Sequence, residues 1–365
     1  MTELPPLTVC ERLLALLDEE GGRIPVLVGL CGSGRTTALR AVGDVLGADG
    51  CQYVDVERTA TTPERFLVSL LAGTPFGIAR PAGSPSGSRQ AFDAVLAFFA
   101  EARGAAQNPA TFLLDEALEF RTFESFPGLR HAMPELLAVL AASPNRFVLS
   151  SRYVARTSRV IAAAPSRFAI VPVPALSVDD IRRMLRPRSR LNDAPDSSAG
   201  GDALATAAYI VHHLSEGRAA YAHALVEALT TVDACGPIDP VAALAALLEP
   251  GSRVASLCTF GYELRLHRAR GYGALKAILD ILAAEEPLTL TEVARRLGRT
   301  PGSTKDYLSW LEDVDLIAAH RKRYRFSDPV MRIWVRLHCR PVPPATEDIG
   351  REVQQYAASR LSPAR

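Results

Sequence analysis

Long hydrophobic runs are missing from this chain of 365 residues, although 48% of its residues are hydrophobic. No apolar stretch reaches the length needed to cross a bilayer, and the N-terminus carries acids where a signal peptide needs basic residues. Cysteine pairs are missing too, since the six cysteines are scattered without a C-x-x-C pair or metal-ligand spacing. These absences argue against a membrane span, a disulfide framework and a zinc site. We therefore expect a cytoplasmic protein that makes no membrane contact.

A dominant charge of either sign is also missing. Lysine and arginine total 41 against 40 aspartates and glutamates, which gives a net charge of +1. No overall field therefore draws the chain toward nucleic acid, and any such contact must come from a local patch. The length predicts two or three domains with a substantial core.

The first half of the chain alternates short apolar runs with amphipathic segments. The expected strands are residues 25–29, 51–56, 111–115, 146–150 and 167–173. Apolar strands alternating with helices predict an α/β domain, in which helices cover both faces of a parallel sheet. We place this domain at residues 1–174, with residues 80–88 as an exposed loop.

After residue 174 the pattern becomes helical. Residues 175–250 are expected to form a helical lid, with two helices meeting near Gly217. Within the lid, residues 186–201 are rich in Pro, Ser, Asp and Gly, which predicts a flexible linker or insertion. A further domain is expected over residues 251–345 and a C-terminal tail over residues 346–365.

A glycine-rich loop follows the first expected strand. Residues 29–36, GLCGSGRT, fit the phosphate-loop spacing G-x-x-x-x-G-K-[ST], with Arg35 at the lysine position. Glycines let backbone N–H groups point inward, and the following helix presents its positive end to an anion. The candidate phosphate-binding residues are Gly29, Gly32, Ser33, Gly34, Arg35, Thr36 and Thr37. The alternative is an ordinary turn between a strand and a helix.

Two acids favour the nucleotide-site interpretation. Asp115 and Glu116 end the apolar strand TFLLDE, where either acid can also be a simple turn former. Together with the loop, they predict that Thr36 and Asp115 hold Mg²⁺ and that Glu116 activates the attacking water. Arginine keeps the positive charge of the usual lysine but is bulkier, planar and prefers bidentate contacts. We therefore expect ATP binding with slow hydrolysis.

With these motifs the chain resembles AAA+-type ATPases of archaea and bacteria that end in a winged helix. It is similar to the STAND-type NTPases and more distantly to origin-recognition ATPases. The resemblance rests on the loop, on LLDE at 113–116, VLSSR at 148–152, the junction VPALSVDDIRRML at 173–185 and SDPVMRIW at 327–334. It implies an AAA+-like P-loop core, a helical lid and a C-terminal winged helix, with ATP and Mg²⁺ as cofactors.

The resemblance also implies roles for several polar residues. A polar sensor is expected at Ser150 or Ser151, with plain turn chemistry as the alternative. Three arginines that follow the fourth strand are candidates for an arginine finger toward a neighbouring subunit, with solvated helix positions as the alternative: Arg152, Arg156 and Arg159. The lid carries SEGRAAYAHAL in place of the usual sensor turn, so Arg218 is shifted from the sensor position.

The third domain has the pattern of a winged helix-turn-helix. Thr289 and Glu292 predict a capping box, and Thr300 caps a second helix. LIAAHRKRYRFS at 316–327 then predicts a two-stranded wing. On duplex DNA the second helix would present Ser303, Thr304 and Lys305 to the major groove. The residues expected against phosphates are Arg321, Lys322, Arg323 and Arg325 of the wing.

The same helix also carries acids, among them Asp306 and Glu312, that would oppose phosphate. Winged helices also serve as protein-docking modules, so a protein partner or self-association is the alternative to DNA. The function expected from the sequence is an ATP-dependent regulatory switch with slow hydrolysis. The alternatives are a P-loop scaffold without catalysis and a DNA-binding regulator that no longer uses ATP.

Overall fold

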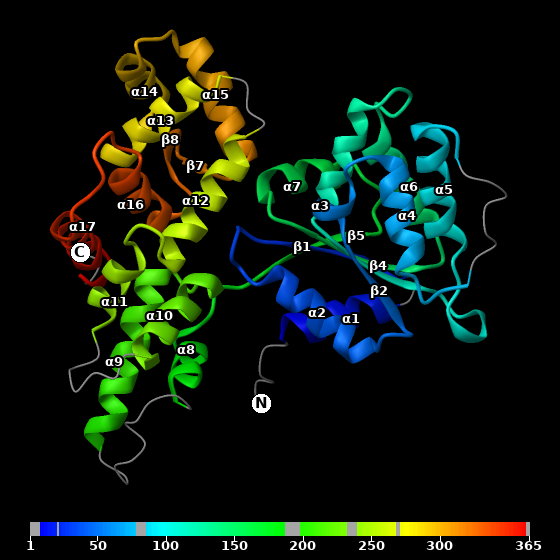
Figure 1. Ribbon diagram of the computed structural model, residues 1–365, viewed down its shortest axis with the longest axis horizontal. Coiled ribbons are helices and arrows are strands. Elements are labelled where there is room, and N and C mark those ends of the chain that lie inside the picture. The colour runs from blue at the N-terminus through cyan, green and yellow to red at the C-terminus, as the bar shows by residue number, and fades with distance from the viewer. Residues whose placement is uncertain are drawn as a thin grey trace. The chain divides into compact units, whose positions relative to one another are not determined.

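The computed structural model describes residues 8–19, 22–77, 85–186, 198–231, 239–267 and 271–362. The chain divides into two compact units (Figure 1), the first comprising Met1–Leu30 with Gly34–Pro174 and the second Cys31–Ser33 with Ala175–Arg365. The expected linker at 187–197, and residues 80–84 of the expected loop, lie outside the described residues.

A five-stranded parallel sheet forms the centre of the first unit. Its strands are β1 (Ile24–Val28), β2 (Cys51–Asp55), β3 (Thr111–Asp115), β4 (Arg146–Ser151) and β5 (Phe168–Pro172). They lie in the order β2-β3-β4-β1-β5 and every neighbouring pair is parallel. The sheet predicted from the apolar runs is therefore confirmed, with strand ends within two residues of those expected.

Helices connect these strands. They are α1 (Val9–Asp18), α2 (Arg35–Leu46), α3 (Val56–Thr59), α4 (Pro63–Ala72), α5 (Ser88–Glu101), α6 (Ala132–Ala142) and α7 (Val154–Ala162), with 3₁₀ helices η1 (Ala105–Gln107) and η2 (Ala117–Ser125). Parallel strands need such crossover connections, and the helices they supply cover the sheet.

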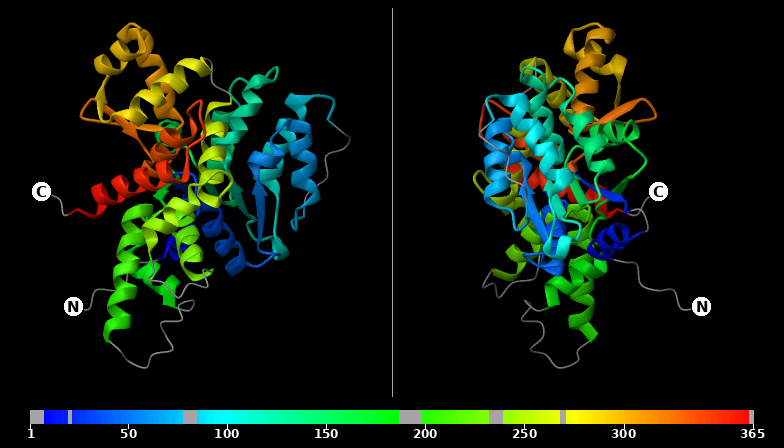
Figure 2. Two further views of the ribbon diagram at one scale, coloured as in Figure 1. Left: turned by 60° about the vertical axis from the view of Figure 1, so that its left-hand side comes forward. Right: turned by 90° about the vertical axis from the view of Figure 1, so that its right-hand side faces the viewer.

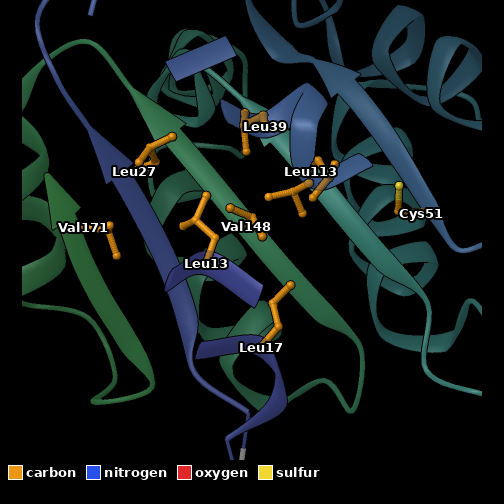
Figure 3. Close-up of a cluster of buried hydrophobic side chains, with 9 residues drawn as sticks. Leu13, Leu17, Leu27, Leu39, Cys51, Leu113, Val148 and Val171 are labelled. Carbon is orange, nitrogen blue, oxygen red and sulfur yellow. The ribbon is translucent and has the colours of Figure 1, made fainter. Parts of the chain in front are cut away.

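One face of the sheet packs against α1 and α2. Leu113 of β3 and Val148 of β4 point toward Leu13 of α1 and Leu39 of α2 (Figure 3), and all four side chains are buried. These contacts hold α2 on the sheet, and α2 is the helix that follows the glycine-rich loop.

The opposite face of the sheet is aromatic, because successive strand residues point to opposite sides. Phe112 and Phe147 precede Leu113 and Val148 in sequence and stack with ring centroids 5.5 Å apart. Phe99 of α5 meets Phe112 edge-on at 5.1 Å. Both faces of β3 and β4 are therefore apolar, and the polar residues of these strands lie at their ends.

The second unit is mainly helical, as the sequence predicted. Its helices are α8 (Val178–Leu185), α9 (Ser198–Ser215), α10 (Ala219–Thr231), α11 (Pro240–Leu247), α12 (Arg253–Leu266), α13 (Tyr272–Ala284), α14 (Leu290–Leu297), α15 (Pro301–Asp313), α16 (Pro329–His338) and α17 (Thr346–Leu361). Strands β6 (Leu288–Thr289), β7 (Ile317–His320) and β8 (Arg323–Phe326) form an antiparallel sheet in the order β6-β8-β7.

Helices α13–α15 and the β7–β8 hairpin make the winged helix, and the hairpin, drawn in orange, extends from the helices in Figure 2. The capping box of Thr289 and Glu292 is present, with the Thr289 N–H donating to Glu292 at 2.7 Å. Arg321 and Lys322 form the two-residue turn of the hairpin, with φ of 50° and 62°. Positive φ at both positions is what a primed two-residue turn requires.

Two segments differ from the sequence-based expectation. Residues 198–201, expected in the linker, begin α9. Residues 346–361, expected in a tail, form α17, because Ile349, Val353 and Tyr356 recur at helical spacing and are buried. The Tyr356 hydroxyl donates to the Leu214 carbonyl of α9 at 2.9 Å.

In the part of the chain that the structure describes, no helix combines the length and the apolar character that a membrane span requires.

Candidate functional site

The glycine-rich loop joins β1 to α2. Gly32 and Gly34 have φ of 79° and 96°, a region that side chains disfavour and glycine adopts freely. Among the described residues no side chain caps α2, so no capping group competes with an anion for the start of this helix. Ser33 lies between the two glycines, and Thr37 is exposed in the first turn of α2.

The loop lies at the edge of the sheet where the parallel strands end. Val28 of β1 is paired with Ser151 of β4, and Asp55 of β2 with Asp115 of β3. Strand ends in register bring the polar residues that follow them to the same edge, which is where ligands bind in open α/β sheets.

Asp115 accepts hydrogen bonds from three hydroxyl groups at this edge of the sheet. Its Oδ2 accepts from Thr36 Oγ1 at 2.7 Å and from Tyr53 Oη at 2.7 Å, and its Oδ1 accepts from Ser150 Oγ. Burial and the hydrogen bond to Asp115 raise the pKa of Tyr53, so the phenol remains a donor. The predicted pair of Thr36 and Asp115 is therefore brought together. Tyr53 was not identified from the sequence, because the strand order that places β2 beside β3 is what brings it to Asp115.

Glu116 is held in an unusual backbone conformation at the end of β3. Its φ is 57°, which non-glycine residues adopt rarely and which occurs most often at constrained sites. Its N–H donates to Ser150 Oγ at 3.0 Å. Ser150 thus connects Asp115 and Glu116 and is fully buried. Ser151 has a different role, because its Oγ accepts from the Tyr153 N–H in a local turn.

Arg35 is folded back onto its own loop. Its Nη1 donates to the Gly29 carbonyl and, at 2.8 Å, to the Leu30 carbonyl. Its Nη2 donates to Glu116 Oε1 at 2.6 Å, and both side chains are more than nine-tenths buried. The guanidinium group is therefore committed to the loop and to the expected catalytic acid.

A second arginine holds the other oxygen of Glu116. The Arg152 N–H donates to Glu116 Oε2 at 3.1 Å, and Arg152 Nε lies 3.1 Å from the same oxygen. Arg152 also pairs with Glu57, which follows β2 and was not identified from the sequence. Burial lowers the pKa of Arg152, but Glu116 and Glu57 outweigh that effect and raise it.

These contacts correct the arginine-finger interpretation for Arg152. The side chain is 5% exposed and paired inside its own unit, so it does not reach toward a neighbouring subunit. Arg156 lies over the Tyr153 ring at 5.0 Å, and Arg159 is exposed on α7.

Arg218 has a partner in its own unit. Its Nη1 donates to Asp328 Oδ2 at 2.7 Å, and Tyr221 Oη donates to the same oxygen at 2.8 Å. Asp328 Oδ1 accepts from the N–H groups of Val330 and Met331 at the start of α16. Arg218, which precedes α10, and Tyr221 within α10 are thereby joined to the aspartate-proline pair that opens α16.

The basic residues of the winged helix lie on its surface. The exposed ones include Lys305, Arg321, Lys322, Arg323 and Arg325. Arg323 and Arg325 are on one side of β8, because residues two apart in a strand share a face. The prediction that Thr304 faces the major groove was wrong. Thr304 is fully buried, and its hydroxyl donates to the Thr300 carbonyl at 2.9 Å.

The fold is similar to that of a solved ATPase structure. A Walker-type ATPase of Pyrococcus abyssi is 16% identical, with a TM-score of 0.66 over 90% of this chain and 94% of that chain. The chain therefore has the same overall fold as that structure. The AAA+-like architecture expected from the sequence, with its C-terminal winged helix, is therefore confirmed.

Further comparisons concern the winged helix and other solved structures. Residues 274–318 match the family of winged helix-turn-helix DNA-binding domains, and no curated protein matches the chain. The Orc1 protein of Aeropyrum pernix, solved in complex with DNA, is 14% identical, with a TM-score of 0.45 over 96% of this chain and 91% of that chain. Cdc6p of Pyrobaculum aerophilum is 11% identical, with a TM-score of 0.40 over 99% and 97%. The assignment to the STAND group stays a prediction.

Proposed function

We propose that this protein binds MgATP at residues 29–36 and 115–116, hydrolyses it slowly, and uses the bound nucleotide to regulate DNA contact by its winged helix. The observation that supports this most directly is the convergence of Thr36 and Arg35 on Asp115 and Glu116, with donor–acceptor distances of 2.7 and 2.6 Å. The loop and the acids are about 80 residues apart in sequence, so an ordinary strand–helix turn does not account for their meeting.

The residues present fit a magnesium nucleotide. Magnesium prefers hard oxygen ligands and is commonly held by one or two protein groups together with substrate phosphates. The Thr36 hydroxyl and the Asp115 carboxylate supply such oxygens, whereas the described residues contain no cluster of three or more His, Cys, Asp or Glu placed to hold a metal by themselves. When bound, Mg²⁺ would neutralise charge on the phosphate oxygens.

Slow turnover follows from the contacts of Glu116. A general base must be free to accept a proton from water. Here both carboxylate oxygens are already engaged, Oε1 by the guanidinium group of Arg35 and Oε2 by that of Arg152. Binding of a γ-phosphate would compete with Glu116 for Arg35, so part of the binding free energy is used to separate that ion pair.

The test is nucleotide binding and phosphate release by the wild type, Arg35→Lys, Glu116→Gln and Thr36→Ala. We expect Mg²⁺-dependent ATP binding and slow release in the wild type, and faster release in Arg35→Lys. Glu116→Gln should bind ATP at least as tightly, because the ion pair is weakened, and release no phosphate. Thr36→Ala should lose the Mg²⁺ dependence. Absence of ATP binding by the wild type in the presence of Mg²⁺ would contradict the proposal.

A P-loop scaffold without catalysis is the second candidate function, and the two ion pairs of Glu116 favour it. ATP binding without phosphate release in both the wild type and Arg35→Lys would select it. The DNA-binding regulator that no longer uses ATP would be selected by DNA binding without ATP binding.

Duplex DNA is the partner that the wing supports. Its cations are exposed, and the matched family is described as DNA-binding. Binding through phosphates must weaken with salt, so the slope of affinity against salt concentration measures these contacts. A protein partner or self-association is the alternative, for which a concentration-dependent molecular mass without DNA affinity would be the evidence.

A further inference from the structure

A cavity of about 350 Å³ lies in the second unit, lined mainly by residues of α16 and α17. This volume is in the range of pockets that take small molecules. Arg332 and Arg336 of α16 and Arg360 of α17 line it, with Glu286 and Glu352 as its two carboxylates. Arg332 and Arg336 are four residues apart in a helix and therefore lie on the same side of it.

Arg332 has hydrogen-bonding capacity that its protein contacts do not use. Its Nε donates to the Ala283 carbonyl at 3.1 Å and lies 3.3 Å from Glu286 Oε1. A guanidinium group has five N–H donors. Within the described ranges, the two terminal nitrogens of Arg332 make no hydrogen bond.

Arg336 is similarly incomplete. Its Nη2 donates to Glu352 Oε1 at 2.8 Å. Its Nε is buried and has no hydrogen-bond partner among the described residues. A buried donor without an acceptor costs free energy, so the protein contacts of Arg336 do not satisfy all of its guanidinium N–H groups.

The carboxylates of the cavity do not accept hydrogen bonds from these unused N–H groups of Arg332 and Arg336. Glu286 Oε2 already accepts from the Phe326 N–H at 2.6 Å, and Glu352 is used by Arg336. Arg360 Nη2 lies 2.8 Å from Glu216 Oε1, and its guanidinium lies over the Tyr356 ring. Each of the three arginines is therefore paired with a glutamate, so the formal charges around the cavity are nearly balanced. The cavity still has more N–H donors than acceptors.

The effects of the surrounding groups on the pKa of Arg332 are consistent with this surplus of donors. Burial lowers the pKa of Arg332, and although Glu286 and Glu352 raise it, Arg336 and Arg360 lower it further. A phosphate group has several acceptor oxygens and a negative charge, and it pairs with arginine in a bidentate geometry. The remaining wall is partly apolar, since Ile333 and the Tyr356 ring also line the cavity.

We propose that this cavity binds a phosphorylated small molecule, with Arg332 and Arg336 donating to the phosphate and Ile333 and Tyr356 contacting the organic part. The site is separate in sequence from the glycine-rich loop and does not depend on the nucleotide proposal. Its alternative is a set of ion pairs that only braces α17 against α16.

Isothermal titration of the full chain with ribose 5-phosphate tests this, with unphosphorylated ribose and inorganic phosphate as reference ligands. We compare the wild type with Arg332→Gln, Arg336→Gln and Arg336→Lys, and with Arg340→Gln as a matched control, because Arg340 is exposed and lies outside the cavity. The loop at residues 29–36 is the same in all five proteins, so differences between them report on the cavity.

The expected result is saturable binding of ribose 5-phosphate by the wild type and by Arg340→Gln. Binding should be weaker by about tenfold or more in each glutamine variant, because each loses a charged donor. Arg336→Lys keeps the charge but loses the fork geometry, so its affinity should fall between. Circular dichroism confirms folding of each variant. Equal affinity in the wild type and the folded glutamine or lysine variants overturns the proposal, as does absence of binding to the wild type, and either outcome assigns the arginines to bracing.

Discussion

At the scale of single residues, the candidate nucleotide site depends on how two arginines share one glutamate. Arg35 occupies the lysine position of a phosphate loop, yet its guanidinium is bonded to the loop carbonyls and to Glu116. Arg152 holds the other oxygen of Glu116 and also Glu57. Buried charges of this kind depend on every member of the network, because removal of one leaves another uncompensated.

Arg152→Gln should therefore destabilise the protein by about 3–5 kcal/mol, the range typical for removing one member of a buried pair. Urea-induced unfolding, followed by circular dichroism, measures this change. Arg183→Gln is the control, since Arg183 is 73% exposed in its pair with Asp180 and a surface pair contributes about 0–1 kcal/mol. A loss in Arg152→Gln as small as in the control would contradict the contacts described for Glu116.

At the scale of secondary-structure elements, the N-terminus of α16 is the point where separate segments of the second unit meet. Asp328 caps α16 with one carboxylate oxygen and accepts from Arg218 and Tyr221 with the other. The aspartate-proline pair in SDPVMRIW thus has a physical reason: proline suits the first helical turn, and the aspartate caps it.

Asp328→Ala should destabilise the second unit more than loss of an ordinary N-cap, which costs about 0.5–2 kcal/mol. The excess arises because Arg218, only 9% exposed, would be left buried without its carboxylate. Asp328→Asn keeps acceptor capacity for the cap but removes the charge, so its loss should be intermediate. Thermal unfolding of the three proteins gives the order, and equal losses in both variants would show that the ion pair adds nothing.

The wing turn offers a second test at this scale. Arg321 and Lys322 both have positive φ, a conformation that Asn-Gly adopts more readily. The double variant Arg321→Asn, Lys322→Gly should keep or raise stability while weakening duplex DNA binding. If both cations contact phosphates, the slope of log affinity against log salt should fall by about 0.9 for each contact.

Arg340→Gln with Arg351→Gln removes two exposed cations elsewhere in the second unit and is the matched control. Fluorescence anisotropy at several salt concentrations separates the two variants. The same salt slope in both would show that the wing is not the DNA contact.

At the scale of the whole molecule, the proposed switch is a coupling between two ligands. If ATP changes the affinity for DNA by some factor, DNA must change the affinity for ATP by the same factor. We therefore expect equal factors from DNA titrations with and without MgATP and from ATP titrations with and without DNA. Glu116→Gln, which should prevent turnover, keeps the measurement at equilibrium. A factor of one in both directions would leave two independent binding domains without a switch.

Much of the fold could be predicted because it depends on local patterns. Apolar runs such as TFLLD and the helices between them predict a parallel sheet, and the caps at Thr289 and Thr300 predict the helices of the winged domain. The helix α17 within the expected tail was not predicted, because it has a strongly charged surface. Its apolar positions are recognised as a buried face only when α9 and α16 are there to cover them.

The sequence by itself determined which residues can act at the candidate site, because loop spacing and strand-end acids are local features that follow from backbone geometry. It did not determine which of them act on each other. That Arg35 meets Glu116, that Tyr53 joins Thr36 on Asp115, and that Arg152 is buried all depend on strand order. Placing β3 between β2 and β4 is a long-range choice made by packing both faces of the sheet, so only the tertiary structure decided how these charges are paired.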